Sequence, residues 1–99
     1  MYVCIFRAQI KELDDEYREM AERMRSLAMN AYGCTRFSAT TEGNTEIALS
    51  YWDSLDDIQA WKANAEHLKA QSKGRSNWYQ SYEVQITEVI RSYDFSIPE

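Results

Sequence analysis

The chain has 99 residues, of which 44% are hydrophobic, and its formal net charge is −5 at pH 7. A chain of this length builds one hydrophobic core, so residues 1–99 are expected to form a single domain. The acidic balance, without a cluster of Lys and Arg, argues against nucleic-acid binding, because a phosphate backbone requires a basic surface.

The sequence also lacks the signals of several other classes. Its first residues contain no basic leader, and no run of about 18 apolar residues could span a bilayer. Its two cysteines, Cys4 and Cys34, match no metal-binding or redox spacing. These features predict a reduced, cytoplasmic protein with no membrane segment and no metal site.

The first third of the chain has a strand pattern followed by a helix pattern. Residues 2–10 are β-branched and aromatic without Gly or Pro, which is typical of a strand. Acidic residues at 14–16 then favour the start of a helix, and Gly33 is expected to end it in a left-handed conformation. The apolar stripe of this helix recurs at steps of three and four: Leu13, Tyr17, Met20, Met24, Leu27 and Ala31.

The remaining residues predict a hairpin, a second helix and a closing strand. Residues 34–41 and 45–52 are joined by turn residues at 42–44, which indicates a hairpin. Ser54 begins a capping box, and helical spacing follows until a stop signal at Lys73 and Gly74. The second apolar stripe comprises Leu55, Ile58, Trp61, Ala65 and Leu68. Residues 75–81 are predicted to be a polar loop and 82–93 a strand, with a bulge near Glu88.

This order of elements predicts an α+β fold of the ferredoxin-like βαββαβ type. Its four-stranded antiparallel sheet carries both helices on one face. The first two strands are not neighbours in that sheet, so Cys4 and Cys34 should lie too far apart to form a disulfide. The uncovered face needs a partner, and a second copy of the chain packing sheet against sheet meets that need.

Three segments resemble one known family: residues 2–10, 50–71 and 78–95. The middle segment contains the pattern W-x-S-(x)6-W at Trp52, Ser54 and Trp61. Over nearly its whole length the chain is similar to antibiotic biosynthesis monooxygenase (ABM) domains, which have the dimeric α+β barrel fold. The resemblance implies a pocket between helices and sheet in each protomer, and a homodimer to which the last strand contributes. Members include cofactor-free oxygenases of aromatic compounds and haem-degrading oxygenases.

Two side chains are candidates for catalysis. His67 is the only histidine, and it could act as a general base or as a ligand to haem or a metal. The alternative is a partly exposed helix residue near Glu66 and Lys69. Arg7, if it faces the interior, could hold an enolate or phenolate anion. The alternative for Arg7 is an ion pair with a neighbouring carboxylate.

Six side chains are candidates for a substrate-binding wall: Trp61, Phe37, Tyr51, Met20, Met24 and Trp78. Trp61 belongs to an apolar stripe, so core packing is its default role, and a pocket beneath that stripe is compatible with it. Tyr51 and Trp78 are expected to be rim or interface aromatics rather than catalytic acids. Met20 and Met24 are core residues that can double as a pliant wall.

These candidates leave several functions open. The first is a cofactor-independent monooxygenase that desolvates a small aromatic or carbonyl substrate and stabilises its anion, which then reduces O2 itself. The second is a dimer that binds a small molecule in the same pocket without turnover. Haem binding is disfavoured, because in the haem-degrading members the axial histidine would correspond to Gln71, one turn after His67. The last is a purely structural dimer.

Overall fold

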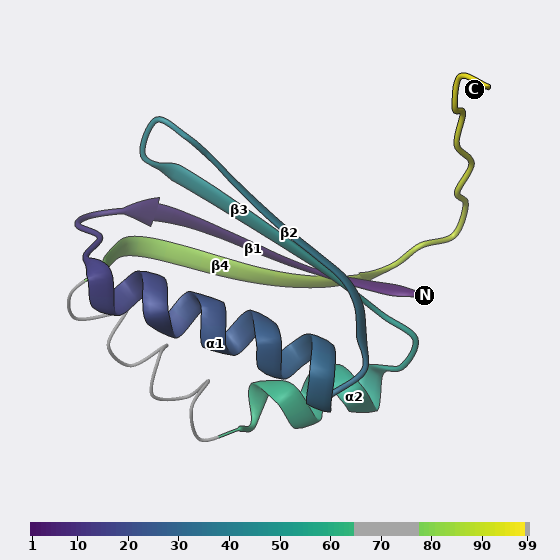
Figure 1. Cartoon of the computed structure of the whole chain (residues 1–99), viewed down its shortest axis with the longest axis horizontal. Helices are drawn as coiled ribbons and strands as arrows, with labels where there is room; N and C mark the ends of the chain where they lie inside the picture. The colour runs from purple at the N-terminus through teal and green to yellow at the C-terminus, as the bar shows by residue number, and fades with distance from the viewer. Residues whose placement is uncertain (65–77, 99) are drawn as a thin grey trace.

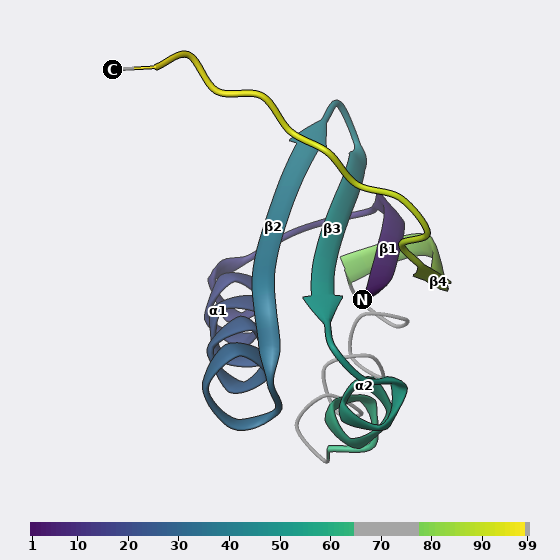
Figure 2. The same cartoon turned by 90° about the vertical axis from the view of Figure 1, so that its right-hand side faces the viewer.

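The computed structural model describes residues 1–64 and 78–98. In chain order the elements are β1 (Tyr2–Ile10), α1 (Asp15–Ala31), β2 (Cys34–Glu42), β3 (Thr45–Trp52), α2 (Leu55–Lys62) and β4 (Tyr79–Glu88). The strands form one antiparallel sheet in the order β2-β3-β1-β4. Both helices lie on the same face of it (Figures 1 and 2). The predicted ferredoxin-like α+β fold is confirmed, and the predicted bounds of the first and third strands match.

The register of the strands gives the sheet a helix-facing side and an open side. Cys4 of β1 is paired with Ser50 of β3, and both belong to the surface that faces the helices. Successive side chains of a strand point to opposite faces, so the neighbouring pair, Val3 and Tyr51, points to the open side. The same alternation places these residues on the open side: Ile5, Arg7, Ile47 and Leu49.

Helix α1 begins and ends as its sequence predicts. The side chain of Asp14 accepts a hydrogen bond from the main-chain amide of Tyr17 at 2.8 Å, and Gly33 adopts a φ of 87°. Tyr17 and Met24 are buried, as the apolar stripe predicts. The stripe was wrong at its end, however, because the fully buried residue is Ala28 and Ala31 is exposed. Ala28 follows Met24 at a step of four, which keeps it on the face toward the sheet.

Helix α2 begins at the predicted capping box, in which Ser54 accepts a hydrogen bond from the amide of Asp57 at 3.1 Å. Ile58 and Trp61 are buried, with 1% and 6% of their surface exposed. Leu55, predicted to be part of the same stripe, is exposed and is the first residue of the helix. The predicted continuation of the helix to residues 73 and 74 lies outside the described residues.

Strand β4 starts earlier than predicted. It begins at Tyr79 rather than at residue 82, because Ile10 at the end of β1 pairs with Tyr79. Trp78, predicted to be in a polar loop, has only 2% of its surface exposed. The irregularity in register lies between Gln9 and Ile10 instead of near Glu88.

Strand β4 also ends earlier than predicted, at Glu88 rather than at residue 93. Its partner β1 starts at Tyr2, which pairs with Glu88, so no strand is available beyond that point. The last bond of this region joins the amide of Val89 to the carbonyl oxygen of Met1 at 2.9 Å. The chain then leaves the sheet as an extended C-terminal segment (Figure 1).

The core packs between the two helices and the centre of the sheet. Trp52 is completely buried, and its ring lies 5.3 Å from the ring of Trp61. The indole N–H of Trp61 donates to the carbonyl oxygen of Met24 at 3.3 Å, which links α2 to α1. Cys4 and Cys34 are both buried and free, so the expectation of no disulfide is confirmed.

The Asp14→Ala substitution should destabilise the protein more than Ser54→Ala. Each removes a helix cap worth about 1 kcal/mol. Asp14 additionally accepts a hydrogen bond from the indole of buried Trp78 at 3.2 Å, and its loss leaves that donor unsatisfied. We expect urea unfolding to show a loss of roughly 2 kcal/mol for Asp14→Ala. Asp14→Asn, which keeps an acceptor oxygen, should recover most of it. Equal losses for the two alanine variants would contradict the role given to the Trp78 bond.

Candidate functional site

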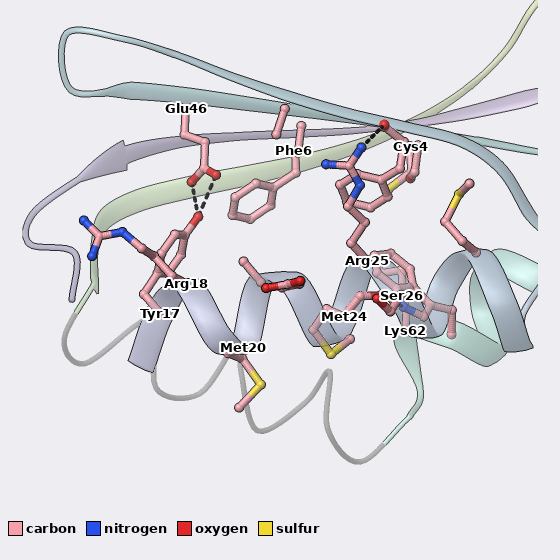
Figure 3. A pocket seen from close by; sticks show the side chains of 18 of the residues that line it. Cys4, Phe6, Tyr17, Arg18, Met20, Met24, Arg25, Ser26, Glu46 and Lys62 are labelled. Carbon is pink, nitrogen blue, oxygen red and sulfur yellow. Dashed lines mark hydrogen bonds between the residues drawn. The ribbon is translucent and has the colours of Figure 1, made fainter. Parts of the chain in front are cut away.

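A cavity of about 720 Å³ lies between α1 and the helix-facing side of the sheet (Figure 3). Aromatic rings, methionines and alanines dominate the part of its wall that the structure describes. The apolar lining residues include Phe6, Met20, Ala21, Met24, Met29, Phe37, Ala39, Ala48, Trp61, Trp78 and Val84. The volume and the apolar wall are typical of sites for small organic molecules.

Most of the predicted wall residues meet in this cavity. Met20, Met24, Phe37, Trp61 and Trp78 all line it. Trp61 is a core residue and a wall residue at once, as its stripe position allows. Trp78 is a buried part of the wall and not a rim aromatic. Whether these side chains bind a substrate stays a prediction.

Arg7 and Tyr51 do not line the cavity, because their strand positions point to the open side of the sheet. The Nη1 atom of Arg7 lies 2.8 Å from Oε1 of Glu83, which is the alternative ion pair and not the inward cation. The ring of Tyr51 lies under the guanidinium of Arg36, at 4.0 Å from the ring centroid. The inward orientation of Arg7 and a place for Tyr51 in this wall were therefore wrong.

His67, the other candidate for catalysis, lies outside the described residues, as do Glu66, Lys69 and Gln71. Its proposed roles as a base or ligand rest on the sequence alone. Among the described residues, no group of three or more His, Cys, Asp or Glu side chains is arranged to hold a metal ion. Likewise, no helix in residues 1–64 or 78–98 has the length and apolarity needed to cross a membrane.

One end of the cavity contains a carboxylate held by a phenol. The hydroxyl of Tyr17 donates to Glu46, with its oxygen 2.6 Å from Oε1 and 2.5 Å from Oε2 (Figure 3). Rings surround the pair: Tyr17 lies 5.2 Å from Trp78 and 5.9 Å from Tyr79, and Phe6 lies 5.4 Å from Tyr79. All five residues line the cavity, as does Arg18, which is paired with Asp15, so this end combines the carboxylate of Glu46 with electron-rich rings.

The two phenols at this end remain protonated near neutral pH. Burial, followed by hydrogen bonds to Glu46 and Tyr79, raises the pKa of Tyr17 far above its usual value. Burial is also the main reason why the pKa of Tyr79 rises to about 12. Tyr17 therefore acts as a donor to Glu46 and adds no charge of its own.

The other end of the cavity carries two cations, Arg25 and Lys62, near the thiol of Cys4 (Figure 3). The guanidinium of Arg25 donates to the carbonyl oxygen of Phe37 at 2.9 Å and lies 5.4 Å from the centroid of its ring. Burial raises the pKa of the Cys4 thiol, an effect that the charge of Lys62 opposes. A buried, protonated thiol is a poor nucleophile, so Cys4 acts here as wall.

Sequence reasoning missed Glu46, Ser50 and Lys62 as cavity residues. For Glu46 and Ser50 the signal was present, because both share the parity of Trp52 on β3 and so face the helices with it. Tyr17 was assigned to the apolar stripe of α1 correctly, but its hydroxyl was not considered as a polar group of the pocket.

Comparison with known proteins identifies the family. Residues 1–73 match the family described as antibiotic biosynthesis monooxygenase. The chain belongs to this ABM family. It is 43% identical over 91 residues to the uncharacterized protein YqjZ of Bacillus subtilis (strain 168), an alignment covering 91% of this chain and 80% of YqjZ.

Solved structures of low sequence identity share the fold. SnoaB, a cofactor-independent oxygenase from Streptomyces nogalater, aligns with a TM-score of 0.77 at 14% identity, covering 92% of this chain and 94% of SnoaB. Rv0793 from Mycobacterium tuberculosis aligns with a TM-score of 0.79 at 10% identity, covering 94% and 98% of the two chains. These likenesses agree with the ABM assignment and with the sheet and helices described above.

The free energy of unfolding should fall as the pH rises from about 10 to about 12. Tyr79 loses its proton at about pH 12 in the folded protein and near its ordinary value of 10 when unfolded. The unfolded state therefore releases its proton first, and the stability present below pH 10 is lost across this interval. Urea unfolding at several pH values measures the loss, and Tyr79→Phe should reduce it. A loss of the same size in Tyr79→Phe as in the wild-type protein would contradict this assignment.

Proposed function

We propose that this protein is a cofactor-independent monooxygenase that acts on a small aromatic or carbonyl compound in the cavity between sheet and helices. The observation that carries the proposal is the cavity itself, about 720 Å³ in volume with a mostly apolar wall in a member of the ABM family. The described wall offers apolar surface and a few charged groups, and such a site works by excluding water and positioning a substrate anion.

The proposed chemistry uses the substrate as its own reductant. A carbon of the substrate enolate or phenolate gives electrons to O2 and forms a C–O bond. The resulting hydroperoxide loses water and leaves a carbonyl group, so one oxygen atom enters the product and the other leaves as water. Of the three cations of the described wall, Arg18 is paired with Asp15, and Arg25 and Lys62 are the ones proposed to stabilise the anion. His67 is the proposed base, on the strength of its side-chain chemistry alone.

A non-catalytic binding protein with the same pocket is the second candidate. It is favoured because two hydroxyls of the described wall make contacts that hold the structure: that of Ser50 accepts from the indole of Trp52, and that of Tyr17 donates to Glu46. Haem as the ligand is the less favoured version of this candidate, because it needs His67 in place of the histidine expected at Gln71.

Oxygen consumption separates the two candidates. With 1-naphthol as a test substrate, we expect the protein to consume one O2 for each naphthoquinone formed, without added metal, flavin or haem. His67→Ala should lower the rate at least tenfold while calorimetry shows unchanged naphthol binding. Binding without O2 uptake, in the wild-type protein, would favour the non-catalytic candidate. A Soret band after incubation with haem, lost in His67→Ala, would instead favour the haem version.

We also propose that the protein is a homodimer that uses the open side of the sheet and the C-terminal segment. The open side carries half-buried apolar residues that no helix covers, among them Ile5, Ile47 and Leu49. The C-terminal segment exposes four large apolar side chains: Ile90 (92%), Tyr93 (85%), Phe95 (85%) and Ile97 (81%). Both surfaces are apolar, and a second copy of the chain that packs against them would remove both from water. A dimeric protein of unknown function from Bacteroides fragilis has a similar fold.

Native mass spectrometry should show a dimer at micromolar concentration. Replacement of Tyr93, Phe95 and Ile97 by Ser should shift it toward monomer, because the segment then has little apolar surface to bury. A dimer that persists unchanged in this triple variant would exclude the C-terminal segment from the interface. A wild-type monomer would exclude the dimer altogether.

A further inference from the structure

The carboxylate of Glu46 has an unusual position for a charged group. It lies on the helix-facing side of β3, in line with Ala48 and Ser50, and it borders the cavity instead of the open side. Its side chain is half-buried. Acidic residues seldom face an apolar interior unless a partner compensates the loss of hydration.

The contacts of Glu46 compensate this charge only in part. A carboxylate has about four acceptor positions, and the hydroxyl of Tyr17 supplies a single proton, shared between the two oxygens. Within residues 1–64 and 78–98 the ion pairs join Arg7 to Glu83 and Arg18 to Asp15, so neither involves Glu46. Arg18 also lines the cavity at this end, but its guanidinium is paired with Asp15 at 2.7 Å, and Arg25 and Lys62 lie toward the opposite end (Figure 3).

A ligand that fills the cavity worsens this deficit. It displaces the water that hydrates Glu46, and a neutral apolar group put in its place leaves a desolvated charge. A protonated amine restores the balance, because it brings an opposite charge and several N–H donors to the free acceptor positions. A hydroxyl group supplies a donor but no charge, so it compensates less.

The surrounding rings favour the same ligand group. Phe6, Tyr17, Trp78 and Tyr79 contact one another around the carboxylate end and all line the cavity. Aromatic faces attract organic cations, and the attraction grows where water is excluded. Tyr17 and Tyr79 stay neutral near pH 7, so their rings keep this character.

We infer that Glu46, held by Tyr17 and walled by aromatic rings, is a recognition site for a protonated amine carried on a flat apolar ligand. This inference deepens the proposed function, since it rests on the cavity as the ligand site and narrows the substrate class to amine-bearing compounds. It does not depend on oxygen chemistry.

A matched series of ligands tests the inference by binding alone. The three probes, 1-naphthylmethylamine, 1-naphthylmethanol and 1-methylnaphthalene, share one ring system and differ in a single group. Dissociation constants from ligand-observed NMR titration at pH 7 should be lowest for the amine. We expect the amine to bind roughly tenfold more tightly than the alcohol, which is the effect of one charge-assisted contact.

Two isosteric variants then locate the effect. Glu46→Gln should abolish the preference for the amine and leave alcohol binding within about twofold. Glu83→Gln, which removes the same charge from β4 on the open side of the sheet, should preserve the preference. Glu46→Asp keeps the charge but withdraws it from the cavity by one methylene, so the preference should fall several-fold; this variant keeps the test open if Glu46→Gln does not fold.

Each contrary result has a distinct meaning. Equal binding of amine and alcohol by the wild-type protein overturns the inference and leaves the ligand cavity intact. A preference that survives Glu46→Gln, or that Glu83→Gln removes equally, assigns the effect to net charge and also overturns it. A preference that is undiminished in Glu46→Asp overturns the placement of the amine at this carboxylate. Absence of binding by all three probes overturns the inference together with the cavity as a site for aromatic ligands.

Discussion

The arrangement of this protein depends on one constraint, which is that two helices must cover one face of a four-stranded sheet in a chain of 99 residues. Trp52, Ile58 and Trp61 fill the space where α2 meets the sheet. Along α1 the apolar side chains line a cavity instead of closing it. A small domain buries little surface even with a filled core. The stability of a small domain with a cavity therefore depends more on what binds in the cavity or on its open side.

The carboxylate of Asp14 shows how the layer between α1 and the sheet keeps its shape around the cavity. A single oxygen accepts hydrogen bonds from the amide of Tyr17 and from the indole of Trp78, which are far apart in the sequence. The cap that starts α1 therefore also fixes two rings of the cavity wall. Because Tyr17 in turn holds Glu46 on β3, the helix start, the wall and the sheet are joined by short polar contacts where apolar packing is thin.

The sequence predicted the fold well because local signals and periodicity determine it. The caps at Asp14 and Ser54 and the left-handed Gly33 were confirmed, as were the bounds of β1 and β3. The errors in the strands concern quantities that depend on pairing partners. The ends of β4 follow from the length of β1, which no feature of residues 79–93 encodes.

The candidate site was predicted less completely, and the reason is geometric. Apolar wall residues such as Met24 and Trp61 belong to stripes, so their periodicity placed them correctly. Arg7 was misplaced because alternation along a strand gives two faces but does not say which one the helices cover. Glu46 was overlooked because a carboxylate in a strand is ordinarily a solvent-facing residue, and only the register with Ser50 and Trp52 reveals its side.

The sulfur content of the cavity wall has a consequence for the lifetime of the protein. Met20, Met24 and Met29 are three of its four methionines, and all line the cavity. Thioether chains are pliant, so this wall can reshape itself around ligands of different outline. They are also readily oxidised to polar sulfoxides. Peroxide that escaped from a reaction in the cavity would oxidise these side chains first. Each molecule would then gradually lose activity as its apolar lining became polar.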